Sequence, residues 1–218
     1  MRKAPPRPSG TPPQEGNLTT LGRIVLEGDG FDPNIFNEPA PCYFEGYWQT
    51  ERHFADIADI LRRELTFKDA HLYRETPAFR DVAAGESVAV HVRCGDYVEK
   101  PKVRAKFHLC TQEYYAHAID AMRAHVPEAT FVVFTENPGW VKANLPALKD
   151  FKFVTGRDEF EDLFLMSQCR HAIIPNSSFG WWGAWLGEWR GKRVITPDRW
   201  HATLPYRDIV PERWQRLR

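Results

Sequence analysis

The sequence has few cysteines, no net charge and no long hydrophobic run, and each of these deficits excludes a class of protein. Among its 218 residues are four cysteines, at positions 42, 94, 110 and 169, without a CxxC pair. Neither the pattern of a zinc site nor the disulfide framework of a small secreted domain is therefore present. Lysine and arginine together number 29, as do aspartate and glutamate, which argues against a nucleic-acid partner. No window approaches the roughly 18 apolar residues that a transmembrane helix needs.

The N-terminus, MRKAPPRPSGTPPQEG, begins with basic residues but lacks the apolar segment of a signal peptide. Together with the isolated cysteines, this predicts free thiols and a cytoplasmic protein. Peripheral association with the inner membrane is compatible with this prediction. Residues 1–17 are rich in proline, glycine and polar side chains, which predicts a disordered tail.

Several catalytic signatures are also missing. The sequence contains no Walker loop, GxGxxG, HExxH or GxSxG, and no DxD-like pair follows an apolar run. We therefore expect neither a metal nor a cofactor. A phosphorylated ligand would have to be held by a few well-placed residues.

What the sequence does contain is an alternation of short apolar runs and helical segments from residue 87 onward. Residues 54–65 are predicted to form an amphipathic helix before this point. Continuous rather than alternating apolar runs predict an α/β fold, with a Rossmann-like, doubly wound parallel sheet covered on both faces. Ligands of such sheets bind beyond the carboxyl ends of the strands. The predicted strands are 87–93, 130–135, 151–155, 171–175 and 193–197.

Three of these ends carry polar groups. The first run ends in His91-Val92-Arg93-Cys94-Gly95-Asp96, and an arginine fork is well suited to grip a phosphate. The spacing alone slightly favours the alternative, in which Arg93 pairs with Asp96 to fix a turn. The second run ends in Thr135-Glu136-Asn137, where a carboxylate can meet a ribose or base. Taken by itself, a polar turn before a helix is the better explanation of Glu136.

The fourth run is followed by Asn176, Ser177, Ser178 and Phe179, then by Gly180-Trp181-Trp182. A helix that opens with two serines offers unpaired N–H groups, hydroxyls and the positive end of its dipole, which together suit a diphosphate. The alternative is plain N-capping, with the tryptophans in the core.

Taken together, these strings resemble the bacterial α-1,2-fucosyltransferases of glycosyltransferase family eleven. The matching segments are HVRCGDY, VFTENPGW, GYWQTERHF and, most specifically, EDLFLMSQCRHAIIPNSSFGWWGAWLG. The resemblance covers residues 42–200. It implies a GT-B-like pair of Rossmann domains, with residues 86–218 as the GDP-fucose-binding donor domain and 18–85 as an incomplete N-terminal acceptor domain with connecting helices.

The implied reaction is inverting transfer of fucose from GDP-fucose to the 2-hydroxyl of a terminal galactose in a surface glycan, without a metal. Arg93 matches the arginine that grips the β-phosphate, and His91 and Asp96 match neighbours in the same motif. Ser177, Ser178, Asn176 and Phe179 would surround the phosphates, and Glu136 the nucleoside. Asp96 and Glu99 are both candidates for the general base, and the sequence does not decide between them.

Two departures from the family pattern bear on activity. Cys94 stands where the family has a second arginine, so one cation expected at the diphosphate is absent. The family's opening strand and GGLGNQ-like glycine loop also have no counterpart here. These departures favour the alternative of a catalytically weak or inactive GDP-sugar-binding remnant.

Overall fold

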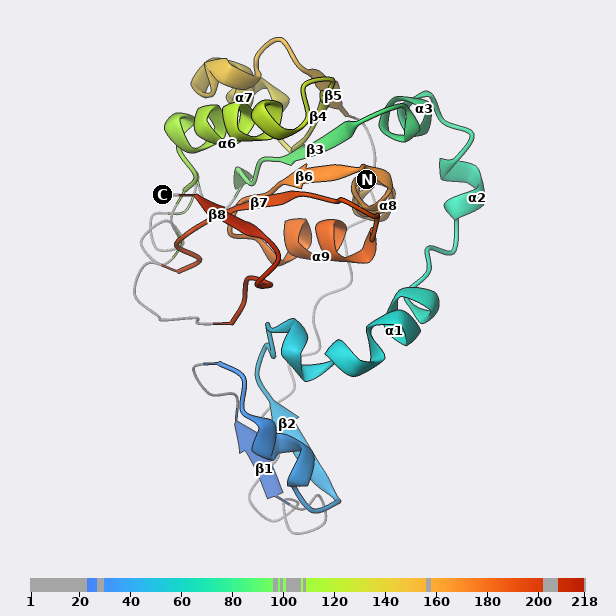
Figure 1. The fold of residues 1–218 in the computed structure, drawn as a ribbon, viewed down its shortest axis with the longest axis vertical. Coiled ribbons are helices and arrows are strands. Elements are labelled where there is room, and N and C mark those ends of the chain that lie inside the picture. Colours follow the sequence, from blue (N-terminus) through green and yellow to red (C-terminus); the bar gives the residue numbers. More distant parts are fainter. Residues whose placement is uncertain are drawn as a thin grey trace.

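The structure, a computed structural model, describes residues 23–26, 30–95, 98, 100, 107, 109–155, 158–201 and 208–217. It is an α/β fold built on a six-stranded sheet in which every paired neighbour is parallel (Figure 1). The strands lie in the order β5-β4-β3-β6-β7-β8. Their bounds are β3 Ser87–His91, β4 Thr130–Phe134, β5 Lys152–Val154, β6 His171–Ile173, β7 Val194–Pro197 and β8 Gln215–Leu217.

Helices cover both faces of this sheet (Figure 1). On one face lie α6 (Gln112–His125), α7 (Pro138–Asn144) and the 3-10 helix η5 (Pro146–Leu148). On the other face lie α8 (Glu159–Gln168) and α9 (Ser178–Leu186), with α3 (Pro77–Ala83) packed against α8.

Alternate residues of the strands supply two separate cores. Along β3, Val88 and Val90 pack with α6, whereas Ala89 packs on the side of α8 and α9. All five residues of β3 are buried. Burial of both faces explains why the strands are apolar throughout rather than alternating.

The five strands predicted from the apolar runs are confirmed, each within about two residues of its expected bounds. The sixth strand, β8, was not predicted, because Gln215-Arg216-Leu217 is short and largely polar. The helix predicted for 54–65 divides into the 3-10 helix η4 (Ala55–Ile57) and α1 (Ala58–Glu64).

The part of the chain before β3 is more open. A two-stranded parallel sheet of β1 (Arg23–Leu26) and β2 (Cys42–Glu45) lies at the end of the molecule farthest from β3, and η2 (Pro33–Asn37) is next to it (Figure 1). From there η3 (Glu51–His53), η4, α1, α2 (Ala70–Tyr73) and α3 lead along one side toward β3. The predicted disordered tail, 1–17, lies outside the described residues.

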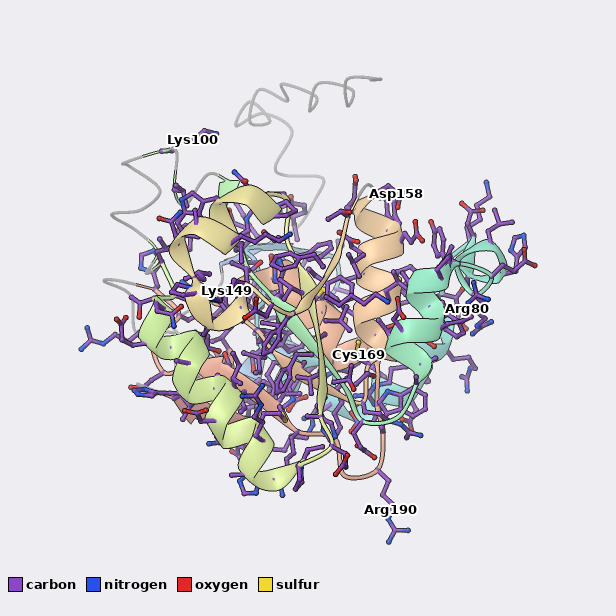
Figure 2. All side chains as sticks on the ribbon, turned by 90° about the horizontal axis from the view of Figure 1, so that it is seen from above. Arg80, Lys100, Lys149, Asp158, Cys169 and Arg190 are labelled. Carbon is purple, nitrogen blue, oxygen red and sulfur yellow. The ribbon has the colours of Figure 1, made fainter. Side chains whose placement is uncertain are left out.

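The four cysteines carry free thiols, as expected. Cys94, Cys110 and Cys169 are buried, and Cys42 is half-buried. Figure 2 shows Cys169 within the packed interior, whereas Arg190 points away from the protein. None of the helices in the described part of the chain combines the length and apolar character needed to cross a bilayer.

Candidate functional site

The chain direction across the sheet reverses at β3, which places a crevice at the strand tips there. From β3 the chain proceeds to β4 and β5 on one side, and it then returns to β6 on the other side of β3. Such a switch point is the usual ligand site of an open α/β sheet. A cavity of about 660 Å³ opens here, and we call it the strand-tip cavity. Its described lining includes His91, Arg93, Thr135, Glu136, Val154, Thr155, Glu159, Asp162, Ser177, Ser178 and Phe179.

Arg93 enters this cavity directly after β3. Its Nη1 forms an ion pair with Glu136 Oε1 at 3.0 Å, and the same oxygen accepts the Cys94 N–H at 3.1 Å. Gly95, at φ +28°, leaves room for this arrangement, because a Cβ there would lie 2.7 Å from Glu136 Oε1. Glu136 is therefore an ion-pair partner of Arg93, and it orients the guanidinium across the tips of two strands. Its predicted contact with the nucleoside stays a prediction.

His91 is buried below Arg93, with 4% of its surface exposed. Its ring lies 5.4 Å from that of Phe179, and its Nδ1 has no hydrogen-bond partner among the described residues. Burial, reinforced by the Arg93 charge, lowers the pKa of His91 to about 3. The imidazole is consequently neutral at physiological pH. It contributes shape and a polar atom to the cavity, while Arg93 supplies the charge.

The lowered pKa makes a prediction for stability. Because the folded pKa is about 3 and the ordinary value is 6.5, the unfolded chain binds more protons between these values, so stability falls as the pH is lowered through 6.5. Between about pH 7 and about pH 5, His91 should remove about 2 kcal/mol from the free energy of unfolding. Urea unfolding of the wild type and of His91→Gln at both pH values measures the difference. Equal pH dependence in the two proteins would contradict the buried, neutral imidazole.

The N-terminus of α9 forms the opposite wall. The neighbouring helices are capped by side chains: Thr111 accepts from Tyr114 N–H in α6, Asn137 from Trp140 N–H in α7, and Asp158 from Glu161 N–H in α8. Figure 2 shows Asp158 at the start of α8.

In α9, by contrast, the N-cap residue Ser177 makes no side-chain capping hydrogen bond. The N–H groups of a first helical turn have no partner within the helix. Ser177 and Ser178 line the strand-tip cavity, so these donors and the positive end of the dipole are available to an anion there.

The predicted site residues divide into three groups in the structure. His91, Arg93, Glu136, Ser177, Ser178 and Phe179 come together around the strand-tip cavity. Asn176 is 1% exposed, and its Nδ2 donates to the Trp200 carbonyl at 2.8 Å, which ties the end of β6 to the segment after β7. Its direct contact with a donor stays a prediction. Asp96 and Glu99, the candidate bases, lie outside the described residues.

Cys94 faces the core rather than the cavity. It is 1% exposed, and its Sγ lies 3.7 Å from Thr135 Oγ1. Burial raises the pKa of the thiol to about 11, so it carries no charge at neutral pH. Among the described residues that line the cavity, Arg93 provides the one permanent positive charge.

Sequence reasoning missed two acidic residues at the site. Glu159 and Asp162, in the first turn of α8, line the cavity at the tip of β5. The signal was present, because they follow the third apolar run just as Glu136 follows the second. They place two carboxylates in the cavity beside the tip of β5.

Comparison with known proteins agrees with this geometry. Residues 26–214 match the family described as "Glycosyl transferase family 11". The chain belongs to this glycosyltransferase family. The match includes β2 and strands β3 to β7 of the six-stranded sheet, and it ends one residue before β8.

Three relatives are about a third identical to the chain over the aligned segments. An α-1,2-colitosyltransferase of Escherichia coli is 34% identical over 181 residues, covering 80% of this chain and 62% of the relative. The O-antigen biosynthesis glycosyltransferase WbnK of Escherichia coli is 31% identical over 68% of this chain and 49% of its own length. A galactoside α-(1,2)-fucosyltransferase 1 of Saimiri sciureus is 32% identical over 61% and 39%. The chain thus spans at most about three fifths of these relatives.

Proposed function

We propose that the chain is the donor-binding part of an inverting fucosyltransferase that moves fucose from GDP-fucose to the 2-hydroxyl of a terminal galactose in a surface glycan. The observation that carries the proposal is the anion site at the switch point, where Arg93 faces the uncapped start of α9. Membership of the family gives the reaction class, and the relatives' names, colitosyl- and fucosyltransferase, point to a deoxysugar and an α-1,2 linkage.

The diphosphate would occupy the centre of the strand-tip cavity. Arg93 can hold an oxygen pair in its guanidinium fork, and the first-turn N–H groups of α9 with the Ser177 and Ser178 hydroxyls can hold the others. Glu136 keeps the guanidinium in place, so the cation is already oriented when the donor arrives. A site of this kind would hold a diphosphate through protein groups alone. That no metal takes part stays a prediction.

The base would extend toward the β4–β5 side. Guanine presents two adjacent N–H donors on one edge, N1–H and the 2-amino group, which match the two oxygens of a carboxylate. Adenine lacks this pair of donors. Glu159 and Asp162 provide carboxylates there. They are therefore suited to select the guanine nucleotide. Binding of the base there would also fix the orientation of the donor, with its base toward β4 and β5.

Catalysis would rest on stabilising the leaving group. As the bond from the sugar C1 to the phosphate oxygen breaks, negative charge grows on GDP and positive charge on the sugar ring. Arg93 and the α9 dipole are fixed opposite the first of these charges. The acceptor oxygen bonds to C1 from the opposite face and gives its proton to a general base, for which Asp96 and Glu99 remain the two candidates.

At the level of architecture, we propose that the six-stranded sheet is the donor domain of a GT-B-like pair, with residues 18–85 belonging to the acceptor side. The proposal is supported by the match to relatives that are longer than this chain. Acceptor recognition would then depend largely on the part that precedes β3.

Calorimetric titration of the chain with GDP and then GDP-fucose, first without a metal and then with Mg²⁺, tests the proposal. We expect saturable binding of GDP, tighter binding of GDP-fucose, and no gain from Mg²⁺, because the anion site is made of protein groups. ATP serves as the control nucleotide. An absence of GDP binding at millimolar concentration, or equal affinity for ATP, would contradict the assignment.

One observation favours the second candidate, a GDP-sugar-binding remnant with weak or no activity. The family's second arginine is replaced by Cys94, which is buried and uncharged, so the described cavity has one cation beside three carboxylates. This candidate and the enzyme share donor binding and differ in turnover. Transfer of labelled fucose to lactose or another galactoside therefore separates them.

A further inference from the structure

A second cavity adjoins the strand-tip cavity on the β7 side. It measures about 230 Å³, and aromatic rings make most of its walls, so we call it the aromatic cavity. Ser178, at the start of α9, lines both cavities. A group attached to a phosphate at the start of α9 would therefore be within reach of the aromatic cavity. Its aromatic walls are Tyr47, Trp48, Phe54, Trp181, Trp182 and Trp200.

The order of the strands places the two cavities in line. The strand-tip cavity lies over the tips of β5, β4, β3 and β6, whereas Trp200 in the aromatic cavity follows β7. If the base lies over β4 and β5 and the diphosphate at β3 and β6, the next group along the donor lies toward β7. That group is the sugar.

The aromatic cavity also has the chemistry of a deoxysugar site. The described residues that line it carry no charged side chain, so it suits a neutral ligand. Its volume is below the range of about 300–1,000 Å³ typical of drug-sized ligands, and it therefore suits one ring rather than a longer glycan. Aromatic faces favour the C–H surface of a pyranose and a methyl group over a hydroxymethyl group, because a buried hydroxyl needs a hydrogen-bond partner.

Its outer wall is held in an unfavourable conformation. Trp48 has φ 50°, a left-handed backbone that a bulky side chain rarely adopts, and its Nε1 is buried without a partner among the described residues. The ring packs edge-on against Phe44 and His53. Strain of this kind persists only where the surroundings enforce it, and it is often found at ligand sites.

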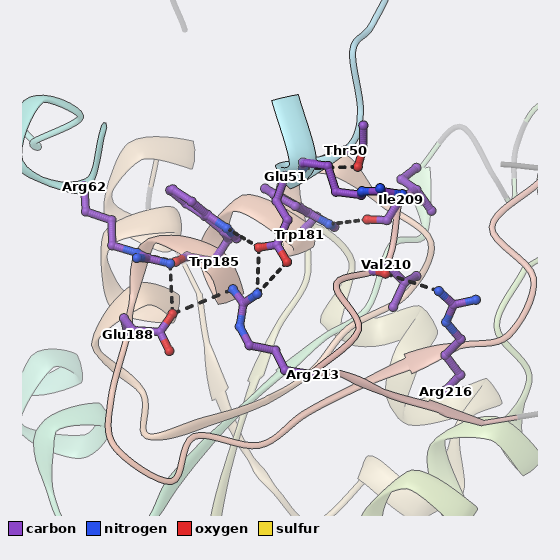
Figure 3. A network of polar contacts seen from close by, with 11 residues as sticks. Thr50, Glu51, Arg62, Trp181, Trp185, Glu188, Ile209, Val210, Arg213 and Arg216 are labelled. Atoms are coloured by element: carbon purple, nitrogen blue, oxygen red, sulfur yellow. Dashed lines mark hydrogen bonds and ion pairs between the residues drawn. The ribbon is translucent and has the colours of Figure 1, made fainter. Parts of the chain in front are cut away.

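A network of polar contacts supplies that enforcement. Glu51, three residues after Trp48, accepts from Trp185 Nε1 at 3.0 Å and from Arg213 Nη1 at 2.6 Å (Figure 3). Trp181 Nε1 donates to the Ile209 carbonyl at 2.7 Å, which fixes another part of the wall (Figure 3). The segment from Trp48 to Glu51 is thereby tied to α9, so the cavity is formed before any ligand binds.

We infer that the aromatic cavity binds the sugar ring of the nucleotide donor and selects a 6-deoxyhexose, with Trp48 as a specificity-determining residue. The inference rests on the proposed function, since it places the sugar relative to a diphosphate at Arg93 and α9. It assigns the preference for a methyl group at C6 to the aromatic wall rather than to the polar groups around the phosphates.

The test compares three ligands that differ in one feature at a time: GDP, GDP-L-fucose and GDP-L-galactose, which adds only a hydroxyl at C6 of fucose. In the wild type we expect GDP-L-fucose to bind about ten-fold or more tightly than both others, because an apolar pocket rejects an added hydroxyl by up to about a hundred-fold. Trp48→Gly removes the ring and relieves the positive φ. It should bind GDP like the wild type and lose most of the gain from fucose, by about ten-fold.

Two further variants act as controls. Trp48→Phe keeps an aromatic face and should keep most of the gain, whereas Tyr43→Ala removes an exposed aromatic side chain that does not line the cavity and should change nothing. If Trp48→Gly does not fold, Tyr47→Ala, at an 82% exposed position in the cavity wall, gives the same comparison.

Three results would overturn the inference. They are full retention of the fucose gain in Trp48→Gly, equal loss of GDP and GDP-fucose affinity, and a loss confined to the galactoside acceptor with donor binding unchanged. The last would make the cavity an acceptor site. Failure of the wild type to bind GDP would instead contradict the proposed function itself, so the two failures are distinguishable.

Discussion

Replacing Arg93 with alanine is expected to weaken GDP binding by on the order of ten- to a hundred-fold and to abolish detectable transfer. A charge-assisted hydrogen bond contributes about 1.5–3 kcal/mol, which corresponds to that loss of affinity. The change also leaves Glu136 without its partner beside the phosphates, which adds repulsion. Because the Arg93 side chain is 37% exposed and absent from both cores, the melting temperature should change little. Calorimetry and thermal unfolding measure both effects.

Two variants separate charge from geometry at this position. Arg93→Lys keeps the cation but loses the fork, so it should recover only part of the affinity. Combining Arg93→Ala with Glu136→Gln removes the repulsive carboxylate and should bind GDP better than Arg93→Ala alone. If Arg93→Ala unfolds the chain or keeps nearly full affinity, Arg93 does not have the assigned role.

Replacing Gly180 with alanine is expected to lower the free energy of unfolding by about 1–3 kcal/mol, the usual cost of overpacking a core. Alanine normally stabilises a helix relative to glycine by about 1 kcal/mol, so the expected sign is reversed here. A Cβ at Gly180 would lie 2.6 Å from His91 Nδ1 and 3.3 Å from Ile174 Cβ. His91 is buried, and its carbonyl accepts from Tyr115 OH at 3.1 Å, so it has little freedom to move.

The same substitution should displace the start of α9 and weaken GDP binding, since Gly180 lies within its first turn. Gly139→Ala is the matched control, because the new Cβ would be 3.7 Å from Asn137 Oδ1, an ordinary contact, and stability should be kept or raised. Urea unfolding of both variants gives the comparison. A more stable Gly180→Ala protein would show that His91 does not pack against α9 as described.

The sequence predicted the sheet well because burial on both faces produces strands that are apolar at consecutive positions. The strand that contains Val88, Ala89 and Val90 must be apolar at every position, and it was recognised for that reason. The polar strand β8 lies at the edge of the sheet, where pairing with β7 rather than its own composition makes it a strand. Edge pairing of this kind leaves little signal in a single sequence.

The sequence predicted most of the residues that line the site, but not which of them contact each other. Strand order brings His91, Arg93, Ser177 and Ser178 to one cavity, as expected from the ends of parallel strands. The ion pair of Arg93 with Glu136 crosses 43 positions in the sequence, whereas local spacing suggested Asp96.

The orientation of Cys94 was likewise not visible in the motif. An arginine at this position was expected to add a cation at the diphosphate, yet the side chain points into the core. Local motifs identify which residues gather at a strand tip. They do not say which side of the sheet each side chain faces, because the regular alternation of side chains between the two faces stops where the strand ends.

The reactivity of the buried cysteines reports local unfolding of the chain. A thiol reacts with alkylating agents or oxidants as the thiolate, and burial raises the pKa of Cys94 to about 11 and those of Cys110 and Cys169 to about 12. Cys94 and Cys110 lie in the core beneath α6, and Cys169 lies in the core beneath α8 and α9. Each thiol is therefore unreactive while the helices that cover it stay packed on the sheet. The order in which the thiols become reactive shows from which face of the sheet the helices detach first.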